Sequence, residues 1–281
     1  MPMPMNTAPR ARSAPTEAAP VAVADHWIEQ PHGRLFARSW TPRHGAGGNP
    51  FVLLHDSLGC VELWRAFPAQ LAAATGRRVV AYDRLGFGRS QPCGAMPALD
   101  FVAQEAHTGF AALRAQLGID GFVVLGHSVG GGMAVHVAAG YPQACEALVT
   151  ESAQVFAEDR TLQGIAAARD QFADPEQFAR LQRYHGERTA WVLQAWTGSW
   201  LSPAFAGWSL EPVLPTVRCP LLAIHGLLDE FGSEVHPKLL TTRCAGPARM
   251  ALMADTGHLP HRERAAEVVA MIRAFIEAPP R

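Results

Sequence analysis

Val123-Val124-Leu125-Gly126-His127-Ser128-Val129-Gly130-Gly131 is the stretch that decides the fold of this chain. An apolar run typical of a buried strand leads into the pattern Gly-x-Ser-x-Gly, and a helical pattern rich in glycine and alanine follows. This order predicts the sharp turn known as a nucleophile elbow, which holds its serine in strained backbone geometry with the hydroxyl exposed. Gly126 and Gly130 are expected because a side chain at either position would collide with the neighbouring strand or helix. The stretch therefore predicts that Ser128 is a nucleophile.

A serine hydroxyl attacks only when a base removes its proton, and a third group must orient that base. The elbow predicts an acid and then a histidine further along the chain, each just after a strand. Residues 220–226 are a strand candidate, and Asp229 lies three residues beyond them. Residues 249–253 form the next apolar run, and His258 follows. These spacings suit strands that are separated by helices in an α/β sheet.

Five stretches of the chain resemble signatures of the α/β-hydrolase superfamily, in the order that the superfamily has them. They are Leu53 to Gly59, Tyr82 to Ser90, the elbow, the turn around Asp229, and Gly257 to Glu263. The resemblance runs from about residue 27 to residue 277. It implies an α/β-hydrolase fold, in which helices flank a mostly parallel central sheet and a small helical cap is inserted.

The resemblance also implies roles for individual residues. Ser128 would be the nucleophile, His258 the general base and then the general acid, and Asp229 the residue that fixes the imidazole tautomer. The oxyanion hole would consist of the backbone N–H groups of Ser57 and Val129, which face the charge of the tetrahedral intermediate. Water would then cleave the acyl-enzyme, and no cofactor is expected.

One position departs from the pattern of the superfamily. His-Gly usually precedes the oxyanion residue, whereas this chain has His55-Asp56. A carboxylate that pointed into an oxyanion hole would oppose the developing charge. We expect Asp56 to turn outward and to bond its own loop; the alternative is a subfamily with altered chemistry. His55 is expected to orient the loop through hydrogen bonds, and His127 to point away from the serine.

The acid has alternatives. Glu151 ends the strand candidate that follows the elbow, and some members of the superfamily place the acid there. Asp255 is expected to shape the loop before His258, and the carboxylate of Asp83 to accept backbone N–H groups in a glycine-rich turn. No metal site is expected, because the chain has neither His-Glu-x-x-His nor Cys-x-x-Cys.

The composition is that expected of an ordinary soluble protein. It has 281 residues, 48% of them hydrophobic, and a net charge of −1, which predicts one domain with an insertion. We expect no nucleic-acid partner, because there is no basic run, and no membrane partner, because no apolar stretch could span a bilayer. Five scattered cysteines predict reduced thiols in a cytoplasmic protein.

The organisation along the chain predicts three parts. Residues 1–25 are expected to be a disordered tail without the apolar segment of a secretory signal. The hydrolase core is assigned to residues 26–152 and 213–281, and the helical cap to residues 153–212. The core is expected to open with an antiparallel hairpin, whose strands are Trp27–Pro31 and Arg34–Trp40.

The segment assigned to the cap is rich in aromatic residues. It holds four of the seven tryptophans, and its helical patterns cover residues 161–172, 175–185 and 187–196. These aromatic residues either pack against the core or line an apolar pocket above the serine. The pocket residues that we expect are Leu58, Trp191, Trp196, Trp200 and Leu259.

The sequence thus predicts a serine hydrolase that cleaves a carboxylic ester, thioester or lactone. The serine in the elbow argues against haloalkane dehalogenases and epoxide hydrolases, which carry aspartate there. Leu259 stands where carbon–carbon hydrolases often have tryptophan, but such an enzyme or a perhydrolase is still an alternative. A ligand sensor or an acyl transferase on the same fold is another. The expected partner is a small acyl substrate, and both a monomer and a homodimer are compatible with the sequence.

Overall fold

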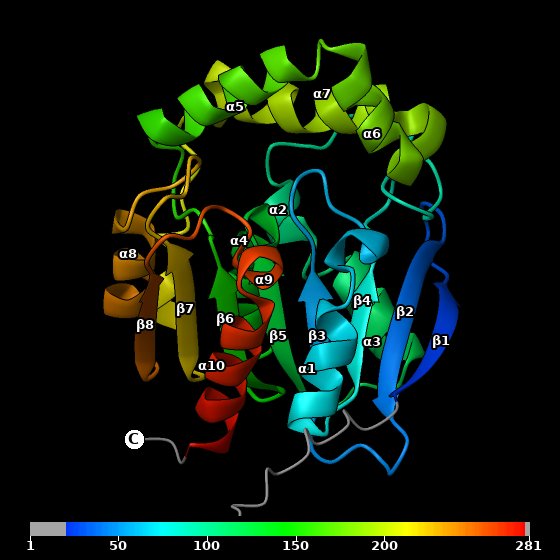
Figure 1. The fold of residues 1–281 in the computed structure, drawn as a ribbon, viewed down its shortest axis with the longest axis vertical. Coiled ribbons are helices and arrows are strands. Elements are labelled where there is room, and N and C mark those ends of the chain that lie inside the picture. Colours follow the sequence, from blue (N-terminus) through cyan, green and yellow to red (C-terminus); the bar gives the residue numbers. More distant parts are fainter. Residues whose placement is uncertain (1–20, 279–281) are drawn as a thin grey trace, which may run out of the picture.

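The computed structural model describes residues 21–278 of the chain, and an eight-stranded sheet forms their centre (Figure 1). The order of the strands is β1-β2-β4-β3-β5-β6-β7-β8. β2 is antiparallel to β1 and β4, and all other neighbours are parallel. The strands are β1 (Val21–Ile28), β2 (Leu35–Pro42), β3 (Phe51–Leu54), β4 (Val79–Tyr82), β5 (Phe122–His127), β6 (Cys145–Glu151), β7 (Leu221–Gly226) and β8 (Ala248–Met253). The α/β-hydrolase fold is confirmed.

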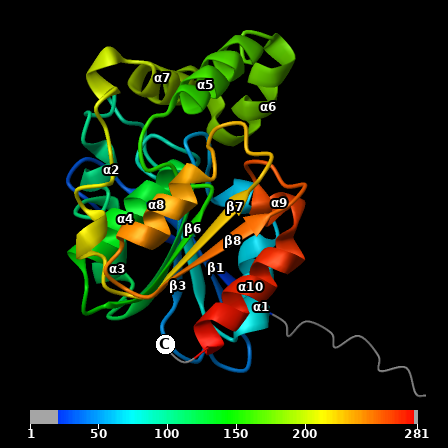
Figure 2. The same cartoon turned by 90° about the vertical axis from the view of Figure 1, so that its left-hand side faces the viewer.

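Helices cover both faces of the sheet, which is why the central strands are apolar along their whole length. Every residue of β3, β4, β5 and β7 is buried. Figure 2 shows one group of helices against each face. The first group is α1 (Phe67–Thr75) and α10 (Ala265–Glu277), and the second is α2 (Phe101–Gln104), α3 (Gly109–Gln116), α4 (Val129–Gly140) and α8 (Val235–Arg243).

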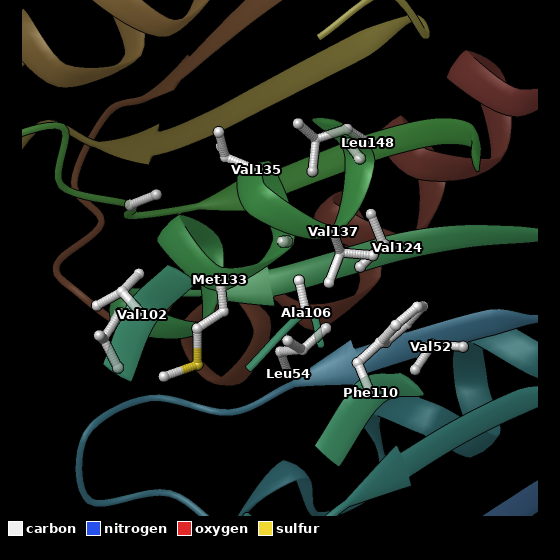
Figure 3. Packing of buried hydrophobic residues seen from close by; sticks show 14 of the residues in the cluster. Val52, Leu54, Val102, Ala106, Phe110, Val124, Met133, Val135, Val137 and Leu148 are labelled. Carbon is white, nitrogen blue, oxygen red and sulfur yellow. The ribbon is translucent and has the colours of Figure 1, made fainter. Parts of the chain in front are cut away.

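The hydrophobic core is divided by the sheet into two clusters. The larger lies under α4 and includes Val124, Met133 and Leu148, which are among the buried side chains drawn in Figure 3. The smaller lies under α1 and α10 and includes Leu53 and Phe67. Packing on both faces fixes the carboxyl ends of the parallel strands, which is where such folds place ligands.

Three helices form a separate layer above these strand ends (Figure 1). They are α5 (Asp159–Gln171), α6 (Pro175–His185) and α7 (Thr189–Trp200), and they lie within the segment that we assigned to a cap. The predicted helices overlap all three. The sequence marks the beginning of α6, because the Asp174 side chain accepts the Glu176 N–H and Pro175 is the first helical residue.

The start of the chain differs from the expectation. β1 begins at Val21, so residues 21–25 belong to the sheet and not to a tail; residues 1–20 lie outside the described part. All eight residues of β1 pair with β2. This strand is held mainly by main-chain pairing, since most of its side chains are not buried. Its first half, Val21 to Ala24, is apolar throughout and lacks the alternation of apolar and polar residues that marks a half-buried strand.

The segment between β4 and β5 holds two short helices, α2 and α3, which residues 105–108 separate. Within the described residues, no helix is both long and apolar enough to cross a bilayer. All five cysteines are free thiols in this structure.

Candidate active site

Ser128 occupies the turn between β5 and α4 with φ 55° and ψ −125°, a strained conformation for a residue other than glycine. The two neighbouring glycines explain how so sharp a turn is possible. A Cβ on Gly126 would lie 2.0 Å from the Gly130 carbonyl oxygen, and one on Gly130 would lie 2.2 Å from that of Leu54. The expected requirement for glycine at both positions is confirmed.

His258 and Asp229 are brought together from two loops, after β8 and β7. Nδ1 of His258 lies 2.9 Å from both carboxylate oxygens of Asp229. Asp229 is fully buried and also accepts the Phe231 N–H at 2.7 Å, whereas the His258 side chain is 11% exposed. The carboxylate thus fixes Nδ1 as the protonated nitrogen and leaves Nε2 free to accept a proton.

The protonation of this pair follows from its surroundings. Burial lowers the pKa of His258, but the hydrogen bond and charge of Asp229 raise it more, so the net pKa is raised. Burial raises the pKa of Asp229, but the hydrogen bonds from His258 and the Phe231 N–H and the charges of His258 and His225 together outweigh it, so the net pKa is lowered. Asp229 is therefore an anion that favours the imidazolium form of His258.

Ser128 and His258 line the same cavity, but they are not hydrogen-bonded to each other within residues 21–278. The Ser128 hydroxyl instead donates to Oε1 of Gln154 at 3.5 Å, a distance at the limit of a hydrogen bond. Catalytic hydrogen bonds in unliganded sites are commonly long and shorten when substrate binds. In this structure the hydroxyl faces Gln154, a contact that sequence reasoning did not find.

The backbone N–H groups of Ser57 and Val129 have no acceptor among the described residues. His55 fixes the loop that carries Ser57. Its Nδ1 donates to the Asp56 carbonyl at 2.8 Å and its Nε2 accepts the Arg84 N–H at 3.1 Å, as expected. Burial holds the pKa of His55 well below its usual value, so the ring is neutral.

Asp56 does not turn outward, and that expectation is wrong. Its Oδ2 lies 3.5 Å from Nδ1 of His127, and its Oδ1 is buried with no partner among the described residues. A Cβ on Gly59 would lie 2.2 Å from Oδ1, so the missing side chain at residue 59 makes room for the carboxyl group. His127 in turn lies 2.8 Å from the main-chain oxygen of His258 through its Nε2.

Glu151 is not placed to orient His258. Its Oε2 lies 2.7 Å from Nδ1 of His261, and the side chains of both are almost completely buried. The prediction of Glu151 as an alternative acid is therefore wrong. At the end of β6 its carboxylate points toward α9 (Pro260–Glu263) and away from the cavity. Asp83 accepts the N–H groups of Val61 and Arg89, so its expected structural position is confirmed.

The cavity above Ser128 has a volume of about 220 Å³ and mostly apolar walls. Of the residues expected in the pocket, four line it: Leu58, Trp196, Trp200 and Leu259. Trp191 does not, and this prediction is wrong. Its ring packs edge-on against Phe87 and lines a different cavity of about 290 Å³. On α7, Trp196 and Trp200 are four residues apart and share a face, whereas Trp191 is five residues before Trp196 and points elsewhere.

Several lining residues were missed by sequence reasoning: Gln154, Ile165, Phe172 and Phe231. Ile165, Ala168 and Phe172 recur at the three- and four-residue spacing of one helix face, and this signal was available in the sequence. Phe231 lies two residues after the acid and packs on His258, with ring centroids 4.8 Å apart. The described residues contain no group of side chains suited to hold a metal ion.

A family model described as alpha/beta hydrolase fold matches residues 49–265. The chain belongs to this family. Among curated members, the serine hydrolase BPHL of Mus musculus is 28% identical over 244 residues, which cover 84% of this chain and 81% of the relative. The human 1-acylglycerol-3-phosphate O-acyltransferase ABHD5 is 36% identical over 104 residues. That match covers 36% of this chain and only 28% of the acyltransferase.

Solved structures of the α/β-hydrolase family superpose over most of the chain. The 2-hydroxy-6-oxo-6-phenylhexa-2,4-dienoate hydrolase BphD of Rhodococcus sp. strain RHA1 has a TM-score of 0.76 at 17% identity, covering 92% of this chain and 100% of that one. The enol-lactonase of Burkholderia xenovorans LB400 has a TM-score of 0.70 at 18% identity, with coverages of 90% and 100%. The proline iminopeptidase of Mycobacterium smegmatis has a TM-score of 0.69 at 22% identity, with coverages of 90% and 97%. At these identities the likeness concerns the fold alone.

Proposed function

We propose that this chain is a serine hydrolase that cleaves a carboxylic ester or a related acyl compound, such as a thioester or a lactone. The observation that carries the proposal is the Asp229–His258 pair, which borders the same apolar cavity as the elbow serine. A strained serine, a buried acid–histidine pair and two backbone N–H groups without acceptors are the groups that acyl transfer requires. Hydrolases among the relatives agree with this reading.

The chemistry would proceed in two halves. The Ser128 hydroxyl attacks the substrate carbonyl while Nε2 of His258 takes its proton, and the N–H groups of Ser57 and Val129 bind the oxyanion. His258 then returns the proton to the departing alcohol, which leaves an acyl group on the serine oxygen. In the second half, water loses a proton to His258 and attacks the ester, and the acid is released as the serine is re-protonated.

The walls of the cavity favour an apolar acyl group. A space of about 150 Å³ accommodates benzene, so the volume of about 220 Å³ here suits an aromatic acyl group or an alkyl chain of medium length. Trp196 and Trp200 from α7 and Phe172 beside α5 surround this space. We therefore expect the enzyme to prefer medium-length over very short acyl chains.

The test is the release of p-nitrophenol from its acetate, butyrate, octanoate and decanoate esters, with Ser128→Ala as the matched control. We expect kcat/KM to fall by a factor of about 10⁴ or more in the variant, and the best wild-type substrate to report the depth of the cavity. The absence of turnover above background in the wild type contradicts a general esterase, and favours a ligand sensor or a narrow carbon–carbon hydrolase.

A second candidate is transfer of the acyl group to an alcohol or amine instead of water. The local similarity to the human acyltransferase favours it, although that match covers a small part of the relative. The same acyl-enzyme would serve both reactions. Adding alcohols to the assay distinguishes them, because a transferase forms the new ester at the expense of the free acid.

A further inference from the structure

The proton on His127 is fixed by the group that its ring faces. Nε2 of His127 lies 2.8 Å from the main-chain oxygen of His258, and a carbonyl oxygen can only accept a hydrogen bond. Nε2 therefore carries a proton. In a neutral ring the other nitrogen, Nδ1, then has a lone pair, and this lone pair faces Oδ2 of Asp56 at 3.5 Å. If Asp56 is ionised, two acceptors face each other inside the protein.

The buried carboxylates Asp83 and Asp229 show what an ionised group receives inside this protein, whereas the Asp56 side chain is 19% exposed and only its Oδ1 is fully buried. Asp83 accepts two backbone N–H groups, at 2.6 and 2.7 Å, and Asp229 accepts Nδ1 of His258 and the Phe231 N–H. Burial nevertheless raises the pKa of Asp83 to about 6. Asp56 accepts no N–H group among the described residues, and its Oδ1 is buried without a partner. Of the three carboxylates, an ionised Asp56 would therefore accept the fewest hydrogen bonds.

The charges around Asp56 do not replace the missing donors. Burial raises the pKa of Asp56, while positive charge on His127, Arg262, His55 and His258 lowers it. When all four groups are charged, the net pKa of Asp56 lies below its ordinary value. Burial, however, lowers the pKa of His127 to about 4 and that of His55 well below 6.5, so neither ring is charged at neutral pH. At neutral pH two of the four charges that lower the pKa of Asp56 are therefore absent.

The remaining cations approach Asp56 from other elements but do not bond its carboxyl group. Arg84 donates to the main-chain oxygen of Asp56 at 2.8 Å, and Arg262 comes from α9. In residues 21–278, neither arginine places a nitrogen within 4.0 Å of the carboxyl oxygens. His185, from α6, donates to the Leu58 oxygen through Nε2 and accepts the Gly88 N–H through Nδ1, so it is neutral.

We propose that Asp56 is a neutral carboxylic acid in the working enzyme, whose O–H donates to Nδ1 of His127 and thereby positions the oxyanion loop against the main chain of His258. One proton then satisfies both groups, and a small rotation of the carboxyl group shortens the 3.5 Å separation to a hydrogen bond. Buried acids kept neutral for this purpose occur in other active sites. Asp56 is in this account a positioning residue, since it acts through His127.

A neutral Asp56 explains how a carboxyl group is tolerated beside an oxyanion hole. Only this catalytic consequence rests on the proposed acyl transfer; the protonation of Asp56 does not. Asp56 directly precedes Ser57, whose N–H would bind the developing negative charge. An anion at residue 56 would oppose that charge, whereas a neutral acid does not. Ionisation of Asp56 at high pH is therefore expected to slow the reaction.

The deciding experiment is an infrared difference spectrum of the whole protein at pH 7, wild type minus Asp56→Asn. We expect the carbonyl band of a protonated carboxyl group, which moves when water is exchanged for D₂O. If Asp56→Asn does not fold, Asp56→Gly supplies the reference spectrum. The absence of this band in the wild type overturns the proposal. The result does not depend on ester hydrolysis, so its failure is distinct from failure of the proposed function.

A pH profile tests the positioning role. Asparagine cannot ionise, and its N–H can donate to Nδ1 of His127 as the acid does. We expect the ratio of kcat/KM for wild type to that for Asp56→Asn to fall as the pH rises from about 6 to about 10. Asp56→Ala, which lacks the donor, should be less active than Asp56→Asn across this range. A ratio that is constant with pH, or equal activities of the two variants, contradicts the role.

Discussion

Two carboxylate–histidine pairs use histidines that are three residues apart, His258 in the loop after β8 and His261 in α9, and they differ in what surrounds them. The Asp229–His258 pair borders the cavity above Ser128. The Glu151–His261 pair is closed over by Trp64 and Phe67, whose rings lie 4.7 and 5.6 Å from that of His261. Both pairs have short bonds to Nδ1, so geometry within the pair does not distinguish them. Access to the serine does, and we therefore expect one pair to serve chemistry and the other stability.

The largest effect on activity is expected when the Asp229–His258 pair is broken. Asp229→Asn removes the anion that fixes the tautomer of His258, and in proteases with this arrangement the matching change lowers kcat by about 10⁴. Glu151→Gln is the matched control and should change kcat by no more than about threefold. Steady-state kinetics on the best ester measures both. A larger loss in the control would show that the two pairs act together.

The second prediction concerns stability, to which we expect the Glu151–His261 pair to contribute more than the Asp229–His258 pair. His261→Ala leaves Glu151 buried without its partner, which should lower the free energy of unfolding by about 3–5 kcal/mol. His258→Ala should cost about 1–3 kcal/mol, because Asp229 keeps the Phe231 N–H and the cavity admits water. Urea denaturation gives both values. The double variant Glu151→Gln/His261→Ala should recover part of the loss, and no recovery would argue against an uncompensated charge as its cause.

The third prediction concerns pH. His258 must be neutral to accept the serine proton. Burial lowers its pKa, but the hydrogen bond and charge of Asp229, together with weaker charges nearby, raise it above 6.5. Activity is thus lost as the pH falls through this raised value. In the Asp229→Asn variant the acidic limb of kcat/KM should move to lower pH, because the anion that favours the imidazolium is gone. A limb that stays in place would mean that another group controls it.

The smallest effect compares two tryptophans of α7. Trp196→Ala enlarges the cavity and should raise KM for the octanoate ester by about tenfold with less effect on the acetate ester. Trp191→Ala, on the other side of the helix, should leave the ratio of the two esters within about twofold. Parallel chain-length profiles of the two variants provide the measurement. A changed profile in Trp191→Ala would place the acyl group in the other cavity.

Much of the architecture was predictable from sequence, because close packing and chain geometry leave few choices there. Gly126 and Gly130 are required by carbonyl oxygens little more than 2 Å from where a Cβ would lie. Buried parallel strands such as β3 and β5 are apolar on both faces, so they show as short apolar runs that alternate with helical patterns. The positions of Asp229 and His258 after β7 and β8 follow from this alternation.

The parts that sequence did not reveal depend on the direction of individual side chains. The inward turn of Asp56 is permitted by Gly59 and is directed by His127, which is distant in sequence. The pairing of Glu151 with His261 likewise joins residues 110 positions apart. The face of α7 that lines the cavity depends on how the helix docks, and the first half of β1 depends on main-chain pairing with β2.

The central claim is that Ser128 forms an acyl-enzyme. The most direct test is the intact mass of the protein after rapid mixing with a p-nitrophenyl ester, followed by mapping of the modified peptide. The account predicts a mass increase equal to the acyl group, on the peptide that contains Ser128, in the wild type and not in Ser128→Ala. Turnover of the ester with no covalent species, together with wild-type rates in Ser128→Ala, would contradict it.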